Sequence, residues 1–241
     1  VMTMWGDNGA ECSKFAVLPA LFMVAQMARG IDDEETIHAN FEKEFGIPFE
    51  DFRALDLAGT QNDSAEAIYN PFMGQFDNRV KSGDAAGYAD CAARLAVYAD
   101  HAEYGYLFRS LRALCAFLSV KADLGIRTRA AYLSGDKKAA KALCTDYDAA
   151  LERLDAFYAA YEQQWMHENK PQGFDVVDLR IGGQRQRLLH CRDRLLAYAE
   201  GRLDRIEELE EPVLDCCCEE KADGQATRAI FWHEIASANV I

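Results

Sequence analysis

Apolar residues recur at every third or fourth position through the second half of the chain, which is the spacing of one face of an α-helix. The pattern predicts four long helices, at about 84–101, 104–134, 136–165 and 175–202. Gly135 and the sequence NKPQG separate the later ones. Long helices joined by short connections pack side by side, so the predicted fold class is mainly α, a helical bundle of long antiparallel helices.

The apolar positions of three of these helices form continuous stripes. They are Leu107, Leu111, Leu114, Cys115, Leu118 and Ala122; Ala140, Leu143, Tyr147, Ala150, Leu154, Phe157, Tyr161 and Trp165; and Val177, Ile181, Leu188, Cys191, Leu195 and Tyr198. Aromatic residues in the second stripe are compatible with a cofactor pocket, but their helical spacing favours a hydrophobic core. We expect the Gly182-Gly183 pair to weaken or bend the last helix.

The first third of the chain predicts shorter helices. The uncharged run 15–28 is shorter than the about 20 residues that cross a bilayer, so we interpret it as a buried helix and expect no membrane association. Asp32 or Asp33 is expected to cap the next helix. Pro48 is expected in the first helical position of a further short helix.

The charge and the cysteine content argue against two classes of function, nucleic-acid binding and metal binding. The chain carries 40 acidic and 26 basic residues, a formal net charge of −14, and no basic patch that would attract nucleic acid. Its eight cysteines include no C-x-x-C pair. Adjacent Cys216, Cys217 and Cys218 are poorly placed to share one tetrahedral metal ion, even with Asp215 or His233. We therefore expect free thiols in the cytoplasm, and neither a metal nor a cofactor.

The opening residues have the order of parts found where a barrel strand ends. VMTMW is followed by the turn-like GDNGAE and then by the apolar helix, and functional side chains of a (β/α)8 barrel lie at such strand ends. Trp5 and Asp7 project to the same side of an extended chain. An indole face beside a carboxylate suits a sugar ring. The alternative is structural: Trp5 packs in a core and Asp7 belongs to the turn.

TMWGDNGAECSKFAVLPAL and WMHENKPQGFDVVDLRIGGQRQRL together resemble the C-terminal portion of bacterial β-N-acetylhexosaminidases of glycoside hydrolase family 20, in the branch with a helical domain after the catalytic barrel. The resemblance extends over most of the 241 residues, to the closing NVI. It implies the last strand and helix of the barrel at 1–30, and connecting short helices and loops at 31–83. The helical bundle would occupy 84–206, with a tail at 207–241 that packs back on the body.

The resemblance also implies an activity. The enzyme would remove terminal β-linked N-acetylglucosamine or N-acetylgalactosamine from glycans. In its substrate-assisted mechanism the acetamido oxygen attacks the anomeric carbon, a Glu protonates the leaving oxygen and an Asp orients the acetamide. That Asp-Glu pair would come from the middle of the barrel, ahead of Val1, so we expect this chain alone to be inactive.

The family's last barrel strand ends in Trp-x-Glu, in which Trp walls the sugar subsite and the acid binds the outer hydroxyls. Trp5 and Asp7 match this pattern, with Asp in place of Glu. The departure leaves open whether Asp7 or the later Glu11 reaches the sugar. We take all three residues as the predicted substrate-binding site.

The sequence ENKPQGFD has two interpretations. In one it only stops a helix, with Pro171 and Gly173 ending one helix and Asp175 capping the next. In the other, Glu168, Asn169 and Lys170 dock on the barrel or on a partner subunit of a homodimer.

An alternative function of a different class is a stand-alone helical module for protein interactions. It predicts a well-packed first helix, whereas the end of a barrel would leave one flank of residues 1–28 apolar and uncovered.

Overall fold

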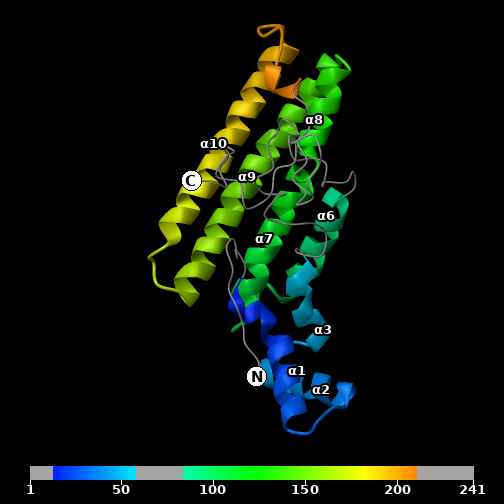
Figure 1. Cartoon of the computed structure of the whole chain (residues 1–241), viewed down its shortest axis with the longest axis vertical. Helices are drawn as coiled ribbons and strands as arrows, with labels where there is room; N and C mark the ends of the chain where they lie inside the picture. The colour runs from blue at the N-terminus through cyan, green and yellow to red at the C-terminus, as the bar shows by residue number, and fades with distance from the viewer. Residues whose placement is uncertain (1–12, 58–83, 211–241) are drawn as a thin grey trace, which may run out of the picture.

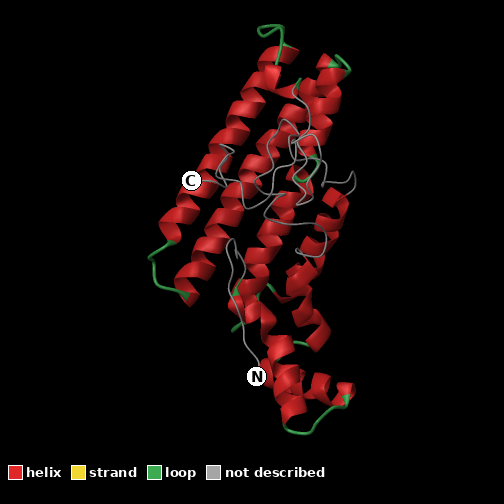
Figure 2. Ribbon diagram, in the orientation of Figure 1, coloured by secondary structure: helices red, strands yellow, loops and turns green. Residues whose placement is uncertain are grey.

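The computed structural model describes residues 13–57 and 84–210, and within these ranges the chain is helical and contains no strand (Figures 1 and 2). The predicted mainly α fold class is therefore confirmed. The predicted strand at VMTMW, residues 60–83, Cys12, the adjacent cysteines 216–218 and the rest of the tail lie outside the described ranges. Among the residues described, no helix combines the length and the apolar character needed to cross a membrane.

Short helices come first. They are η1 Lys14–Val17, α1 Leu18–Ala28, α2 Glu34–Phe45, α3 Phe49–Phe52 and η2 Arg53–Asp56. The Asp33 side chain caps α2 by accepting a hydrogen bond from the backbone N–H of Thr36 at 2.8 Å, as predicted. The prediction for Pro48 is wrong by one position. Pro48 has extended backbone and is the N-cap of α3, because its carbonyl already accepts the first helical hydrogen bonds, from Asp51 and Phe52.

Longer helices form the bundle. They are α6 Asp84–Leu95, continued by η3 Ala96–Tyr98, then α7 Gly105–Lys121, α8 Leu124–Leu133, α9 Lys137–Glu168 and α10 Phe174–Ala199, followed by the one-turn η4 Glu207–Leu209. Helix α7 packs between α6 and α9, and α9 also contacts α8 and α10, so the long helices lie side by side (Figure 1).

The single helix predicted at 104–134 is wrong, because the chain breaks between α7 and α8 at Ala122 and Asp123. The Arg127 guanidinium fixes this corner: its Nε donates to Asp123 Oδ1 at 2.9 Å, and the same side chain pairs with Asp146 of α9. Neither glycine nor proline stands at the break. Since α7 and α8 both pack on α9, the apolar spacing continues across the break between them.

The predicted stripes form one core. All six residues of the first predicted stripe are buried, five of them on α7 and the sixth, Ala122, directly after it. On α9, seven of the eight predicted residues are buried, and Trp165 is half-buried. The aromatic stripe of α9 is thus hydrophobic core, as its spacing predicted. Helix α10 runs without interruption through Gly182 and Gly183, with Ile181 and Gln184 buried on either side of the pair.

A cluster of aromatic rings joins the short helices to the bundle. Its members are Phe22, Phe41, Phe45, Phe49, Phe52, Tyr104 and Phe108. Phe52 lies at its centre, fully buried, with ring centroids of Phe41 at 5.5 Å and of Phe108 at 5.9 Å. Edge-to-face contacts of this kind add to the free energy of burying the rings. The cluster therefore fixes α1–α3 against the start of α7.

Replacement of Phe52 by Ala is expected to lower the free energy of unfolding by about 3–5 kcal/mol, because it removes a buried ring and leaves a cavity. Urea unfolding of the chain measures the change. The matched control is Val97→Ala, at a side chain that is 72% exposed, which should stay within about 0.5 kcal/mol of the parent. Equal effects of the two substitutions would contradict the central role of Phe52.

Candidate functional site

The structure describes one of the two groups of residues that were predicted to be functional. Trp5, Asp7 and Glu11 precede the first described residue. Glu168 is the last residue of α9, while Asn169 and Lys170 belong to the connection between α9 and α10.

The connection between α9 and α10 is held by its own helix ends. The backbone N–H of Asn169 donates to the carbonyl of Trp165 at 2.8 Å, and the Trp165 indole N–H donates to the carbonyl of Lys170, also at 2.8 Å. Gly173 has φ +94°, a conformation that disfavours a side chain, and a Cβ there would lie 3.5 Å from the Trp165 ring. These contacts end α9 and fix the connection to α10, so the structure is consistent with the helix-stop interpretation of this segment.

The predicted cap of α10 is wrong. Gly173 is the N-cap, no side chain caps the helix, and Asp175 lies in its first turn. The helix begins earlier than predicted because Phe174 is buried against the ring of Trp165, at a centroid distance of 5.7 Å. An acidic residue in the first turn still interacts favourably with the helix dipole.

Glu168 accepts a hydrogen bond from the start of the described chain. The Ser13 hydroxyl donates to Glu168 Oε1 at 2.5 Å and accepts a hydrogen bond from the backbone N–H of Phe15 at 3.0 Å, which caps η1. Ser13 is only 6% exposed. The carboxylate at the end of α9 therefore orients the hydroxyl that begins the first helix.

Tyr106, in the first turn of α7, is the second group beside Glu168. Burial raises the pKa of the Tyr106 hydroxyl, and the Glu168 charge and a hydrogen bond to that carboxylate raise it further. The Tyr106 ring also contacts His167, at 4.5 Å between centroids. We call Ser13, Tyr106, His167 and Glu168 the carboxylate junction, because the three other residues meet at or beside one carboxylate.

Sequence reasoning selected Glu168 but missed Ser13 and Tyr106. Ser13 lies 155 residues from Glu168, and an isolated serine before a helix is an ordinary cap. No periodic pattern links such positions, so only the fold reveals the contact.

Helix α1 presents an apolar face to the surface. Val17, the N-cap of α1, and Ala20, Val24 and Met27 on α1 follow each other at three- and four-residue spacing and are all exposed, Met27 to 54%. We call these four residues the α1 stripe. Phe15 on η1 is exposed as well, to 44%.

A groove of about 340 Å³ runs beside the α1 stripe and is lined by Ala16, Val17, Pro19, Ala20, Met23, Glu34, Phe49, Arg53 and Asp56. Its apolar lining extends the stripe toward α3. Contiguous exposed apolar surface of this kind usually marks an interaction site.

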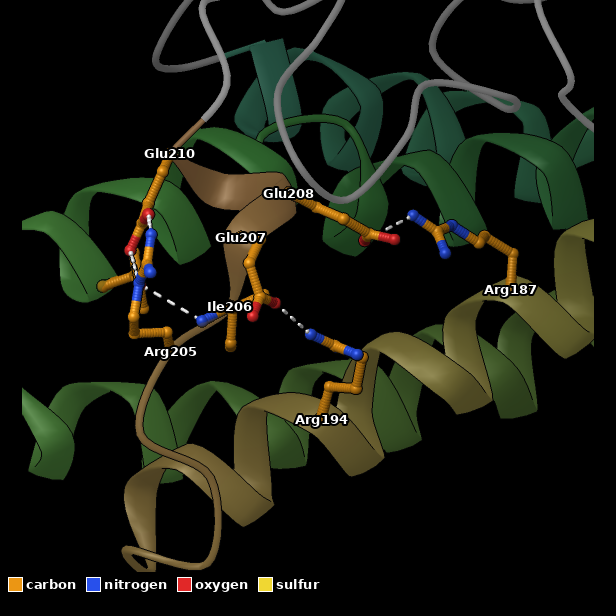
Figure 3. Close-up of polar contacts among 8 residues, drawn as sticks. Arg187, Arg194, Arg205, Ile206, Glu207, Glu208 and Glu210 are labelled. Atoms are coloured by element: carbon orange, nitrogen blue, oxygen red, sulfur yellow. Dashed lines mark hydrogen bonds and ion pairs between the residues drawn. The ribbon is translucent and has the colours of Figure 1, made fainter.

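Residues 205–210, which we call the C-terminal clamp, fasten the end of the described chain to the bundle (Figure 3). Glu208 pairs with Arg187 at 3.0 Å, and Glu207 pairs with Arg194 at 3.0 Å, both arginines being on α10. Ile206 and Leu209 of the clamp are fully buried.

The same clamp reaches α8. The Tyr132 hydroxyl donates to Glu210 Oε1 at 2.6 Å and accepts from the backbone N–H of Ile206 at 3.1 Å. Arg205 pairs with Glu210 as well, and together with Tyr132 it lowers the pKa of the Glu210 carboxyl to about 2. The clamp therefore links α8 to α10 through Glu210 and its neighbours.

Because the folded-state pKa of Glu210 lies below the ordinary 4.5, this group stabilises the fold above about pH 4.5, and the contribution disappears as the pH falls toward 2. We expect Glu210→Gln to be less stable than the parent at pH 7, with a difference that shrinks between pH 4.5 and 2. Unfolding curves across this range measure it. Glu152→Gln, at an exposed position of α9, is the control, and a pH-independent Glu210→Gln difference would contradict the assignment.

The thiols that the structure describes are buried and unpaired. Cys91, Cys115, Cys144 and Cys191 are free. Burial, with a smaller effect of neighbouring Cys91, raises the pKa of Cys115 to about 12. Such thiols are not nucleophiles near neutral pH. Within residues 13–57 and 84–210, no three His, Cys, Asp or Glu side chains are grouped so as to hold a metal ion.

The features described define an all-α domain with an apolar helix exposed at one end. The sequence model of the Glycoside Hydrolase 20C C-terminal domain matches residues 60–228, and the chain belongs to this family. Its setting is therefore that of a family 20 glycoside hydrolase. A search of curated proteins gives no match.

Proposed function

We propose that the chain is the C-terminal part of an exo-acting β-N-acetylhexosaminidase, which removes terminal β-linked N-acetylglucosamine or N-acetylgalactosamine by substrate-assisted retaining hydrolysis. The observation that carries the proposal is the family match over residues 60–228. In this proposal the catalytic Asp-Glu pair belongs to the barrel upstream. The chain by itself does not hydrolyse glycosides.

The α1 stripe supports the placement of a barrel next to the bundle. The family match begins at residue 60, so the stripe lies ahead of it in the sequence. The last helix of a (β/α)8 barrel buries one face on the strands. The exposed face of α1 is the one expected for such a helix, and it disfavours the alternative of a stand-alone interaction module.

In the proposed enzyme Trp5 and Asp7 hold the terminal sugar, with the Trp5 ring against the apolar face of the pyranose and Asp7 accepting hydroxyl hydrogen bonds. Glu11 is the second candidate for the acidic role. No cofactor is needed, because the substrate's own acetamide supplies the nucleophile.

The helical domain is proposed to be structural and to form a homodimer, with its long helices arranged antiparallel. Exposed apolar residues support a contact surface near Asn169 and Lys170: Val176 and Leu179 are one turn apart on α10, and Met166 is on α9. The free buried thiols support a cytoplasmic location.

Trp5→Ala in the intact enzyme is expected to reduce kcat/KM on a chromogenic N-acetylglucosaminide by about 100-fold, because a stacked aromatic wall orients the sugar for attack. The control is Leu133→Ala, at a side chain of α8 that is 61% exposed and lies outside the proposed sugar subsite. Near-normal kinetics of Trp5→Ala would contradict the assignment of the subsite.

Val24→Asp tests whether the α1 stripe is covered in the intact enzyme. A charge introduced into a buried apolar contact is strongly unfavourable, so the midpoint of thermal inactivation should fall by on the order of 5 °C. Val97→Asp introduces the same charge at a side chain that is 72% exposed and should leave the midpoint nearly unchanged. Equal midpoints for the two variants would mean that nothing covers the stripe.

A further inference from the structure

We infer that the groove beside the α1 stripe is a second contact with the rest of the barrel, which fills it with an apolar side chain flanked by a lysine or arginine. The inference rests on the proposed function, which places the rest of the barrel ahead of this chain. It goes beyond the α1 stripe because the groove also includes residues of α2, α3 and η2, at the same end of the molecule (Figure 1).

The apolar lining of the groove is fixed in shape by ring contacts. Phe49 is 5% exposed, and its ring is stacked on His38 at 4.1 Å between centroids and lies edge-to-face with Phe41 at 5.2 Å. Ala20 and Met23 of α1 add to the apolar lining. The volume of about 340 Å³ lies at the small end of ligand pockets, so the groove has room for a few side chains of a partner.

The polar residues of the lining leave the groove with an excess of negative charge. Arg53 Nη1 lies 3.0 Å from Glu50 Oε1, so a carboxylate from outside the lining balances the charge of Arg53. The Glu34 carboxylate is 3.8 Å from His38 Nε2, too far for a hydrogen bond. Asp56 forms no ion pair with another of the residues described. The carboxylates of Glu34 and Asp56 therefore suit a cationic side chain.

The groove is continuous with the α1 stripe. Val17 and Ala20 belong to both, so a surface that covers the stripe also reaches the edge of the groove. An apolar area with charged residues at its border has the composition of a protein–protein contact. We therefore assign one occupant to the stripe and the groove together.

Chain length favours the rest of the barrel as this occupant. In the proposed enzyme it precedes Val1, and the 12 residues before Ser13 span at most about 43 Å when fully extended. The groove lies directly after this point, with Ala16 and Val17 in its lining. A tethered domain is present at a high effective concentration, whereas a second copy of the chain has to be recruited from solution.

Charge reversal at Glu34 tests the inference in the intact enzyme. Glu34→Lys places a cation where a cationic side chain is expected, so the midpoint of thermal inactivation should fall by roughly 3 °C at low salt. The difference from the parent should shrink in 1 M NaCl, where the Debye length is about 3 Å. Asp56→Lys, on a different element, should act in the same direction.

Glu35→Lys is the matched control. Glu35 is the next residue in the first turn of α2, is exposed and does not line the groove. It shares with Glu34→Lys the change in net charge and the unfavourable contact of a cation with a helix N-terminus. Glu34 also lies near His38, so the inference requires that Asp56→Lys, which leaves that contact intact, lowers the midpoint as well.

Two further measurements identify the occupant. Hydrogen–deuterium exchange of the peptide that covers residues 15–28 should rise in Glu34→Lys and not in Glu35→Lys, and sedimentation velocity should show an unchanged association state. Equal midpoints for Glu34→Lys and Glu35→Lys would overturn the inference. A change in association state alone would also overturn it, because a second copy would then fill the groove.

The proposed function fails in a different way. A parent enzyme without hexosaminidase activity would overturn that function, and hydrogen–deuterium exchange would still decide whether the groove is covered, because it needs no turnover.

Discussion

The burial of Phe52 among aromatic rings from both parts of the chain is the constraint on which the arrangement of the molecule depends. Helix α3 has only four residues and η2 another four, lengths at which a helix in water is not stable without tertiary contacts. Their position comes from rings on α2 and α7 that close around Phe52. Helix α1 is held by the same cluster through Phe22, which lies against Phe41. The first third of the described chain thus takes its place from the first turns of α7.

The carboxylate junction adds a polar contact to this apolar one, at the other end of the η1–α1 segment. Aromatic packing is tolerant of small displacements, whereas the hydrogen bond between Ser13 and Glu168 depends on direction as well as distance. The two contacts have different roles for this reason. The rings bury apolar surface that holds the short helices, and the junction fixes the start of η1 against the end of α9.

Much of the bundle could be predicted from the sequence, because its helices repeat an apolar spacing over many turns. The cap at Asp33 was also predictable, since its partner Thr36 is three residues away. The corner at Asp123 was not predictable, because α7 and α8 pack on the same helix, α9, and the apolar three- and four-residue spacing therefore continues across the break. The Gly182-Gly183 pair does not interrupt α10, and a Cβ added at Gly182 would meet nothing within 4 Å among the described residues, so that position has room for a small side chain. The contact between Ser13 and Glu168 joins residues too far apart in sequence for any local pattern to indicate.

Apolar side chains are exposed in a row along the first helix, and this row supports the proposed position of a neighbouring domain. Ion pairs such as Arg185 with Asp155 at 2.7 Å lie exposed on the bundle and contribute little to its stability. They keep that surface hydrophilic. Single exposed apolar residues elsewhere, such as Leu133, are normal for a folded protein. The α1 stripe differs because its members follow each other at helical spacing from the N-cap along α1, and Val17 and Ala20 also line the groove toward Phe49. A domain that covers the stripe would therefore also lie close to the start of η1, where the Ser13 hydroxyl donates a hydrogen bond to Glu168 at the end of α9.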